Sequence, residues 1–403
     1  MSCVTWTFPE DMSRTKGRDN PAMRIQRVDL YDLTLPLVEP FIISGGTMNE
    51  RRSLIVVLHD GEGHRGFGES PPFELPFYSE EILVGARHLL EEVLLPRVVG
   101  KEIEDFAEVD RLIRPGVRGN PFARAALDTA AWDLEAARRG IGLATLVAER
   151  MDVTPATELP CGVALGIPQD RSLDTLRRWI EEAVGRGYRR VKIKVAPGWD
   201  TKPVRAASAV LAGTGLPLTV DANGGYEWPE HEANLRSLDE VELLYIEQPL
   251  HPDELLGHAR LAKALRTQVC IDETLRDARA ARQVAELGGP LVWNVKVHRV
   301  GGLSEACRVV RTGLESGARL WAGTMPESGL GSQAAIAVAA LPGFVYPSDL
   351  EPSVRWFGSG NDVIPLEMSS AGMMPVPQCS IAGMLDEKRF RAATRLVLNL
   401  AAH

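Results

Sequence analysis

The stretch from Val191 to Lys296 decides the fold, because it holds five short apolar runs that each carry a charged side chain at their end. The runs are Val191-Lys-Ile-Lys-Val195, Leu218-Thr-Val-Asp-Ala-Asn223, Leu243-Leu-Tyr-Ile-Glu-Gln-Pro249, Val269-Cys-Ile-Asp-Glu273 and Val292-Trp-Asn-Val-Lys296. From Lys194 through Asp221, Glu247 and Asp272 to Lys296, the intervals are 27, 26, 25 and 24 residues. A strand, a helix and their loops take about that many residues, since eight such units make a barrel of roughly 250.

This rhythm predicts an α/β protein built on a (β/α)₈-type, modified TIM barrel. The runs are nearly continuous in Val, Leu and Ile, as expected for strands buried on both faces. A seventh strand is expected at Arg319–Thr324 and an eighth at Gly343–Tyr346. Helices are expected over Asp170–Gly187, 203–213, 229–239, 254–265, 277–287, 303–316 and 329–340. Because functional side chains of such barrels gather at the carboxyl ends of the strands, we interpret that shared mouth as the active site.

A small α+β capping domain is expected before the barrel, over residues 23–150. Its strands are predicted at Arg24–Leu35, Ser53–Asp60 and His64–Glu69, with a hairpin turn at Asp60-Gly61. Its helices are predicted at Ser79–Val98, Glu104–Ile113 and Asn120–Arg139.

The two ends of the chain lack the regular patterns of these domains. Residues 1–22 have no period and lack the apolar core of a signal peptide, so we expect a disordered leader. The barrel is expected over 151–349. The segment 350–403 should end in a helix over Asp386–Leu398 and pack back on the capping domain.

Composition excludes several classes of function. The net charge of −9 offers no electrostatic footprint for nucleic acid or an anionic membrane. No apolar run reaches the roughly 18 residues of a membrane span. The five cysteines form no C-x-x-C pair and the eight histidines show no zinc-ligand spacing. We therefore expect reduced thiols and a cytoplasmic protein.

Asp221, Glu247 and Asp272 are predicted to converge from adjacent strands. Three carboxylates at one place repel one another strongly unless a cation lies between them. Oxygen ligands without His or Cys select a hard metal ion, Mg²⁺ or Mn²⁺. A single acid of this kind would more often be a helix cap or a surface charge, but three in phase favour a metal site.

The lysines supply the other half of the predicted chemistry. Lys192 and Lys194 lie two apart on a strand and point to the same side, and Lys296 should face them across the mouth. Burial, a second ammonium and a nearby divalent ion would each lower the pKa of a lysine from about 10.4, as a general base requires. The pattern predicts abstraction of a proton α to a carboxylate, with the enolate charge forming against the metal. For Lys296, a bystander ion pair is the alternative.

The order Lys-x-Lys, Asp-Ala-Asn, Glu-Gln-Pro, Asp-Glu, Lys resembles the enolase superfamily, muconate-lactonizing enzyme subgroup, in which a lysine base beside Mg²⁺ is an established pattern. The resemblance implies that Asp221, Glu247 and Asp272 bind Mg²⁺. It implies Lys194 as the base on one face and Lys296 as acid, base or cationic stabiliser on the other. Lys192 would support the bound carboxylate, with Asn223 and Glu273 behind these groups. The run Trp321-Ala-Gly-Thr324 lacks the histidine of the mandelate racemase subgroup.

Further segments are similar to o-succinylbenzoate synthases and N-succinylamino acid racemases. They are Gly162–Gly166, Met325–Gly331, Pro347–Phe357, Pro40–Ser44 and Pro72–Glu80. The resemblance implies that Phe41, Ile43 and Tyr78 select the distal part of the substrate, with core packing as the alternative. Glu327 would lie at the rim after strand seven, with a solvated loop charge as the alternative. Departures at Ala148–Arg150, Val297-His298 and Val376–Ala382 leave the substrate open.

The leading prediction is racemisation of N-acyl or N-succinyl amino acids. Dehydration to o-succinylbenzoate is the first alternative, followed by muconate cycloisomerisation and dipeptide epimerisation. A non-enzymatic barrel would be expected to have lost a ligand or a lysine, and none is missing. The expected partner is a small carboxylate substrate, with no nucleic acid and no membrane, and we expect a homo-oligomer.

Overall fold

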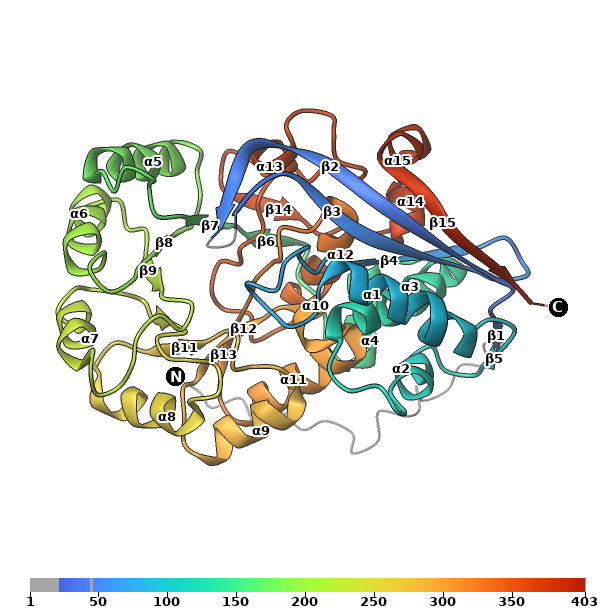
Figure 1. The fold of residues 1–403 in the computed structure, drawn as a ribbon, viewed down its shortest axis with the longest axis horizontal. Coiled ribbons are helices and arrows are strands. Elements are labelled where there is room, and N and C mark those ends of the chain that lie inside the picture. The colour runs from blue at the N-terminus through green and yellow to red at the C-terminus, as the bar shows by residue number, and fades with distance from the viewer. Residues whose placement is uncertain (1–21, 44–45, 403) are drawn as a thin grey trace.

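The structure, a computed structural model, describes residues 22–43 and 46–402, with the backbone alone for residues 41–43, 46 and 47. The predicted leader lies outside the described residues except for Ala22. A curled parallel sheet forms one part and an antiparallel sheet packed on helices forms the other (Figure 1). The α/β barrel with an N-terminal α+β part is therefore confirmed.

The barrel is a seven-stranded sheet in the order β13-β12-β11-β10-β9-β8-β7, with every neighbouring pair parallel. Its strands are β7 (Gly162–Leu165), β8 (Arg190–Lys194), β9 (Leu218–Asp221), β10 (Ile246–Glu247), β11 (Val269–Ile271), β12 (Val292–Val295) and β13 (Arg319–Ala322). The helices that follow are α5 (Leu173–Gly185), α6 (Thr201–Leu211), α7 (Glu232–Asp239), α8 (Leu255–Ala264), α9 (Ala278–Glu286), α10 (Val297–Val300), α11 (Leu303–Glu315) and α12 (Gly329–Ala339). All seven predicted barrel helices are present, with boundaries that differ by a few residues.

The predicted eighth strand, Gly343–Tyr346, is wrong as a regular strand. Segment 343–349 instead makes single backbone hydrogen bonds to β13 on one side, through Leu320 and Ala322, and to Pro160 and Gly162 on the other. Pro347 has no N–H to donate, so a continuous ladder cannot form there. The segment still fills the gap between the two edges of the sheet.

The antiparallel sheet has the order β15-β2-β3-β4. Strands β2 (Arg27–Ile43) and β3 (Gly46–His59) are longer than predicted, because their ladder resumes at Phe41 after a register shift. The hairpin at Asp60-Gly61 is confirmed, since β3 and β4 (Arg65–Ser70) pair up to His59 and Arg65. Two short pairs join distant segments: β1 (Met23–Arg24) with β5 (Glu102–Ile103), and β6 (Glu158–Pro160) with β14 (Met373–Pro375).

The C-terminal helix predicted over Asp386–Leu398 is only half right. Helix α15 spans Glu387–Ala393, and the chain continues as β15 (Thr394–Ala401), antiparallel to β2. Local composition favoured a helix, but the edge of β2 offers unpaired backbone groups that an extended segment satisfies. Helices α13 (Ser353–Phe357) and α14 (Ile381–Met384) precede it.

The first predicted helix begins four residues later than expected. It consists of α1 (Leu83–Leu89), a π-helical segment Leu90–Leu94 and a 3₁₀ turn Leu95–Arg97. Glu81 is engaged elsewhere, because its carboxylate accepts hydrogen bonds of 2.8 Å from the backbone of Phe122 and Ala123 at the start of α3. The remaining helices of this part are α2 (Glu108–Ile113), α3 (Pro121–Arg139) and α4 (Leu143–Arg150), the last of which was not predicted.

Helix α3 lies directly on β4, and glycines make this contact possible. A Cβ atom on Gly66 would lie 2.1 Å from the carbonyl oxygen of Ala130, and one on Gly68 would lie 2.0 Å from that of Ala126. No side chain fits at these distances. No helix of the described chain is long and apolar enough to cross a membrane.

Gly68→Ala should therefore destabilise the protein by more than about 3 kcal/mol, because backbone atoms of α3 would have to move. The free energy of unfolding, measured by urea denaturation, tests this. Gly185→Ala is the matched control, since a Cβ on Gly185 in α5 would meet no atom within 4 Å. Equal stability of the two variants would contradict the packing described here.

Candidate active site

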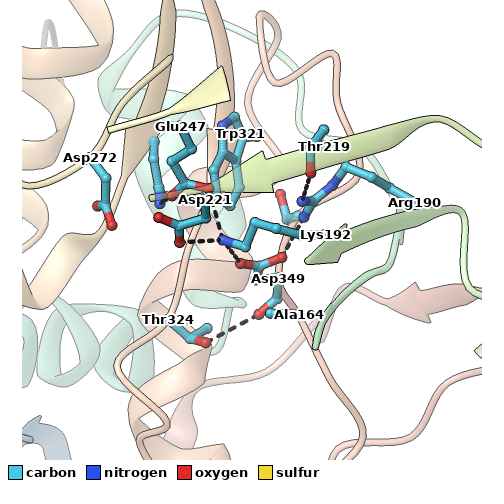
Figure 2. A network of polar contacts seen from close by, with 12 residues as sticks. Ala164, Arg190, Lys192, Thr219, Asp221, Glu247, Asp272, Trp321, Thr324 and Asp349 are labelled. Atoms are coloured by element: carbon cyan, nitrogen blue, oxygen red, sulfur yellow. Dashed lines mark hydrogen bonds and ion pairs between the residues drawn. The ribbon is translucent and has the colours of Figure 1, made fainter. Parts of the chain in front are cut away.

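Parallel register brings the predicted charged residues to one end of the barrel. Lys194 on β8 is the partner of Asp221 on β9, and Asp221 is the partner of Glu247 on β10. Asp272 follows β11 and Lys296 follows β12. Strands β9 to β11 lie between β8 and β12 in the sheet, so the acids are flanked by the two lysines. Figure 2 shows Asp221 and Glu247 beside the ammonium of Lys192, with Asp272 farther from it on the side of Asp221.

Lys192 is buried and holds three carboxylates. Its Nζ lies 2.7 Å from Asp349, 2.9 Å from Glu247 and 3.6 Å from Asp221. It also lies 4.7 Å from the ring centre of Trp321. Burial opposes the charge of Lys192, but these carboxylates, Asp349 foremost, outweigh burial and raise its pKa above the ordinary value.

Next to this charged layer lies a buried, mainly apolar cluster. Tyr245, Cys270, Val292 and Trp321 form one buried cluster. Arg190 lies beside it, stacked at 4.8 Å from the Trp321 ring, with its guanidinium on the Asp349 carboxylate and a 3.2 Å hydrogen bond to Thr219 (Figure 2). The charged layer therefore borders buried side chains that exclude water, and electrostatic interactions are strong in such surroundings.

Asp221 and Glu247 titrate in opposite directions. Burial raises the pKa of Glu247, and the nearby Asp221 raises it further. Burial also opposes ionisation of Asp221, but Lys194 and Lys192 outweigh burial and lower the pKa of Asp221. Asn294 donates a 2.9 Å hydrogen bond to the second oxygen of Glu247. The pair thus favours one firmly ionised carboxylate beside one that resists ionisation.

Lys194 stands at the open side of the mouth. Its side chain is 33% exposed, and its Nζ donates hydrogen bonds of 2.6 Å to Asp221 and 2.5 Å to the side-chain oxygen of Asn223. The Asn223 amide in turn donates to Glu273 at 2.9 Å. Burial, followed by the charge of Asp221, raises the pKa of Glu273. The structure thus brings Lys194, Asn223 and Glu273 together.

Lys296 joins the barrel to the segment before α1. Its Nζ lies 2.9 Å from Asp272, donates a 3.2 Å hydrogen bond to the Tyr78 hydroxyl and lies 5.1 Å from the Tyr78 ring centre. Burial would lower the pKa of Lys296, but Tyr78, Glu273 and Glu247 raise it. The lowered pKa that the sequence predicts for a base lysine beside a divalent ion stays a prediction, since among the protein's own groups the surrounding oxygens outweigh burial at Lys296.

Asp272 offers oxygens that a metal ion can use. It is fully buried, and neither of its carboxylate oxygens accepts a hydrogen bond from the described residues, although Lys296 and Arg299 form ion pairs with it. Its backbone N–H donates to Gln248 at 2.9 Å. A buried carboxylate that lies beside two others and whose oxygens meet only cations fits a hard divalent cation.

The three predicted ligands nevertheless form ion pairs with lysines and do not meet at one point. Within the described chain, the group whose ligand atoms all lie within 4.8 Å of one another is Asp60, Glu62 and His64 at the β3–β4 turn. The two oxygens of Asp60 accept from the backbone of Glu62 and His64 and from the His64 ring, which explains that group as a turn. Asp221, Glu247 and Asp272 instead pair with Lys194, Lys192 and Lys296.

Glu327 lies inside the protein, so the alternative of a solvated loop charge is wrong. It accepts a 2.5 Å hydrogen bond from the backbone of Met325 and lies 3.8 Å from His298 Nδ1. Burial raises the pKa of Glu327 and lowers that of His298 to about 4. Phe41 and Ile43 end β2, and their side chains lie outside the described part of the structure.

Four residues of this site were missed from sequence. Arg190 and Asn294 stand two positions before Lys192 and Lys296, so strand alternation alone could have placed them on the same face. Asp349 follows the irregular eighth segment, and its strand-end position was a usable sign. Arg299 contacts Asp272 from α10, and no pattern in the sequence indicated this contact.

Comparison with known proteins identifies the family of the chain. Residues 27–148 match the family described as mandelate racemase / muconate lactonizing enzyme, N-terminal domain, and residues 175–380 match the enolase C-terminal domain-like family. The N-succinylamino acid racemase of Thermus thermophilus is 41% identical, over 88% of this chain and 93% of its own. The o-succinylbenzoate synthase of Bacillus subtilis is 37% identical, over 83% and 87%.

A crystal structure of an enolase superfamily member from Listeria innocua superposes with a TM-score of 0.87 at 32% identity, covering 94% of this chain and 99% of that one. The chain belongs to the mandelate racemase/muconate lactonizing enzyme family of the enolase superfamily. It is an enzyme of that superfamily, whose members bind a divalent metal ion and typically form an enolate from a carboxylate substrate.

Lys192→Met should destabilise the metal-free protein by about 3–5 kcal/mol, because Glu247 would lose its buried cation and Asp349 would keep only Arg190. Urea denaturation in a chelating buffer measures this. Lys202→Met, which removes an exposed lysine on α6, is the control and should change stability little. An unchanged midpoint for Lys192→Met would mean that the buried ion pairs are not what holds these acids.

Proposed function

We propose that this enzyme racemises N-succinyl or other N-acyl amino acids by moving the proton on the α-carbon, with Mg²⁺ or Mn²⁺ as the metal ion. The observation that carries the proposal is the pair of lysines on either side of the carboxylates. Lys194 approaches from β8 and Lys296 from the end of β12. Racemisation needs a proton donor or acceptor on both faces of one carbon, and two such groups are present.

Asp221, Glu247 and Asp272 would hold the metal ion, as the all-oxygen donor set supports. When bound, a divalent ion supplies positive charge that stabilises the negative charge developing on the substrate carboxylate. Lys192 would keep Glu247 and Asp221 in place from below, since its ammonium is already shared among carboxylates.

The two lysines would exchange roles according to the enantiomer bound. One lysine, neutral at the start, takes the α-proton, and the ammonium of the other delivers a proton to the opposite face. Asn223, held by Glu273, would fix the position of Lys194. Tyr78 would do the same for Lys296 and reach the substrate from the capping side. We retain Phe41, Ile43 and Glu327 as proposed substrate-selecting residues on the resemblance alone.

Dehydration to o-succinylbenzoate is the second candidate, and one observation favours it. The Nζ of Lys296 lies 2.9 Å from the Asp272 carboxylate and donates to the Tyr78 hydroxyl, an arrangement that suits an ammonium held in place. A fixed positive charge suits dehydration, in which one base is enough and the second lysine only stabilises charge. Of the relatives named above, one is named as an N-succinylamino acid racemase and the other as an o-succinylbenzoate synthase.

We also propose a homo-oligomer in the cytoplasm. The cytoplasmic proposal is supported by free thiols, since Cys161, Cys270 and Cys307 are buried and unbridged. The homo-oligomer stays a prediction.

Asp221→Asn should weaken Mg²⁺ binding at least tenfold, because it removes one negative charge from the ligand set. Isothermal titration of chelator-treated protein with MgCl₂ measures the affinity. Asp174→Asn removes an exposed carboxylate on α5 and is the control. Unchanged affinity in Asp221→Asn would count against its assignment as a ligand.

Lys296→Arg should abolish racemisation while leaving α-proton exchange with D₂O for one enantiomer only, because an arginine does not act as a base. NMR of N-succinyl amino acids, each enantiomer separately, measures the exchange. Lys194→Arg is the matched variant and should spare exchange of the other enantiomer. Exchange of both enantiomers in Lys296→Arg would refute the two-base proposal, and full o-succinylbenzoate synthase activity in the same variant would favour the second candidate.

A further inference from the structure

A cavity of about 600 Å³ lies between the α2–α3 connection and the start of α9, and it shares no lining residue with the candidate active site. Four arginines line it, Arg114, Arg118, Arg124 and Arg279, together with a single carboxylate, Asp277. Such an excess of one charge is unusual in a protein whose net charge is −9. The cavity is therefore a local positive site on an acidic protein.

Nearby acids neutralise only part of this charge. Asp110 and Glu305 both pair with Arg114, and both also pair with Arg308 behind it. Asp277 caps α9, where its carboxylate accepts a 2.8 Å hydrogen bond from Ala280. A fourth carboxylate, Glu81, also acts on Arg124, although burial raises the pKa of Glu81 to about 7. Five arginines thus face four carboxylates, and positive charge stays in excess. Arg118 and Arg279 are exposed and form no ion pair with any carboxylate in the described ranges.

Arg124 is the group that points most directly to a ligand. Its side chain is only 11% exposed, and its buried Nη1 donates no hydrogen bond to the described residues. The ion-pair distance from this nitrogen to Asp110 is 4.0 Å, too long for a hydrogen bond. Burial, and then the neighbouring Arg114, lowers the pKa of Arg124. A buried guanidinium N–H without an acceptor costs about 1–3 kcal/mol, and a bound anion would relieve that cost.

We propose that this cavity binds a small anion, held by Arg124 from within and by Arg118 and Arg279 at the entrance. Arginine is suited to this role, because its planar fork matches the oxygens of a phosphate or a carboxylate. The volume of the cavity suits a small molecule such as a phosphate ester or a dicarboxylate. This inference does not rest on the proposed function.

Helix α10 would connect this cavity to the candidate active site. Arg124 packs on Gly301, where a Cβ atom would lie 2.9 Å from its Nη2. Gly301 ends α10, the four-residue helix that begins directly after Lys296. An anion that fixes Arg124 should therefore steady α10 as well.

The test is isothermal titration of the metal-loaded, full-length enzyme with inorganic phosphate and, separately, with succinate, at constant ionic strength in chloride. The double variant Arg118→Gln/Arg279→Gln should bind at least tenfold more weakly than the wild type. The control Arg178→Gln/Arg260→Gln removes the same charge from exposed positions on α5 and α8 and should bind like the wild type. Binding should persist in Lys194→Met, which excludes the active site as its location.

Hydrogen exchange gives a second readout that does not depend on activity. Saturating anion should slow exchange in residues 297–302 at least twofold in the wild type and in the control, and have no effect in the double variant. Binding of phosphate alone would assign the site to phosphate esters, and binding of succinate alone to dicarboxylates. No saturable binding of either, or equal affinity in the wild type and the double variant, would overturn the proposal.

Discussion

The ammonium of Lys192, enclosed by Asp349, Glu247 and Asp221, is the interaction on which the interior of this barrel depends. Taking one ammonium and several carboxylates out of water costs several kcal/mol for each ion, and only mutual pairing offsets that cost. The apolar layer below, centred on Trp321, excludes water and so strengthens the pairing. Asn294 and Arg190 complete the set by satisfying the remaining oxygens of Glu247 and Asp349. A mouth built in this way is preorganised: its charges are fixed in position before a substrate arrives.

The capping part is tied to this mouth by polar contacts as well as by apolar packing. Tyr78 reaches Lys296, and the carboxylate of Glu69 on β4 accepts from Ser328 and Gly331 at the start of α12. Asp128 on α3 accepts from Ser304 on α11. Helix α3 can take part because two glycines of β4 let it lie against the sheet. The position of Lys296 therefore depends on a part of the chain that contributes none of the three proposed metal ligands.

Two places in this molecule have unequal numbers of positive and negative side chains. At the barrel mouth each cation has a carboxylate partner, and the surplus of oxygens favours a divalent ion in addition to the lysines. In the cavity beside α9 the imbalance has the opposite sign, with arginines in excess of acids. Both imbalances lie where the two parts of the chain meet, and α10 links them, since Lys296 precedes it and Gly301 ends it.

The sequence by itself determined the barrel, the capping part, the family and the order of the charged strand ends, because parallel strands must bring their carboxyl ends to one mouth. It also contained Arg190 and Asn294, two positions before recognised lysines. Only the tertiary structure decided the partners: Asp349 and Arg299 come from segments without a regular pattern, and Glu81 caps a helix 40 residues away. The domain boundaries at residues 150 and 349 stay predictions. Local propensity suggested a helix where β15 forms, because the free edge of β2 is invisible in a linear pattern. The tertiary structure likewise decided the direction in which the pKa values of Lys192 and Lys296 shift, since the balance between burial and opposing charge depends on which side chains meet in space.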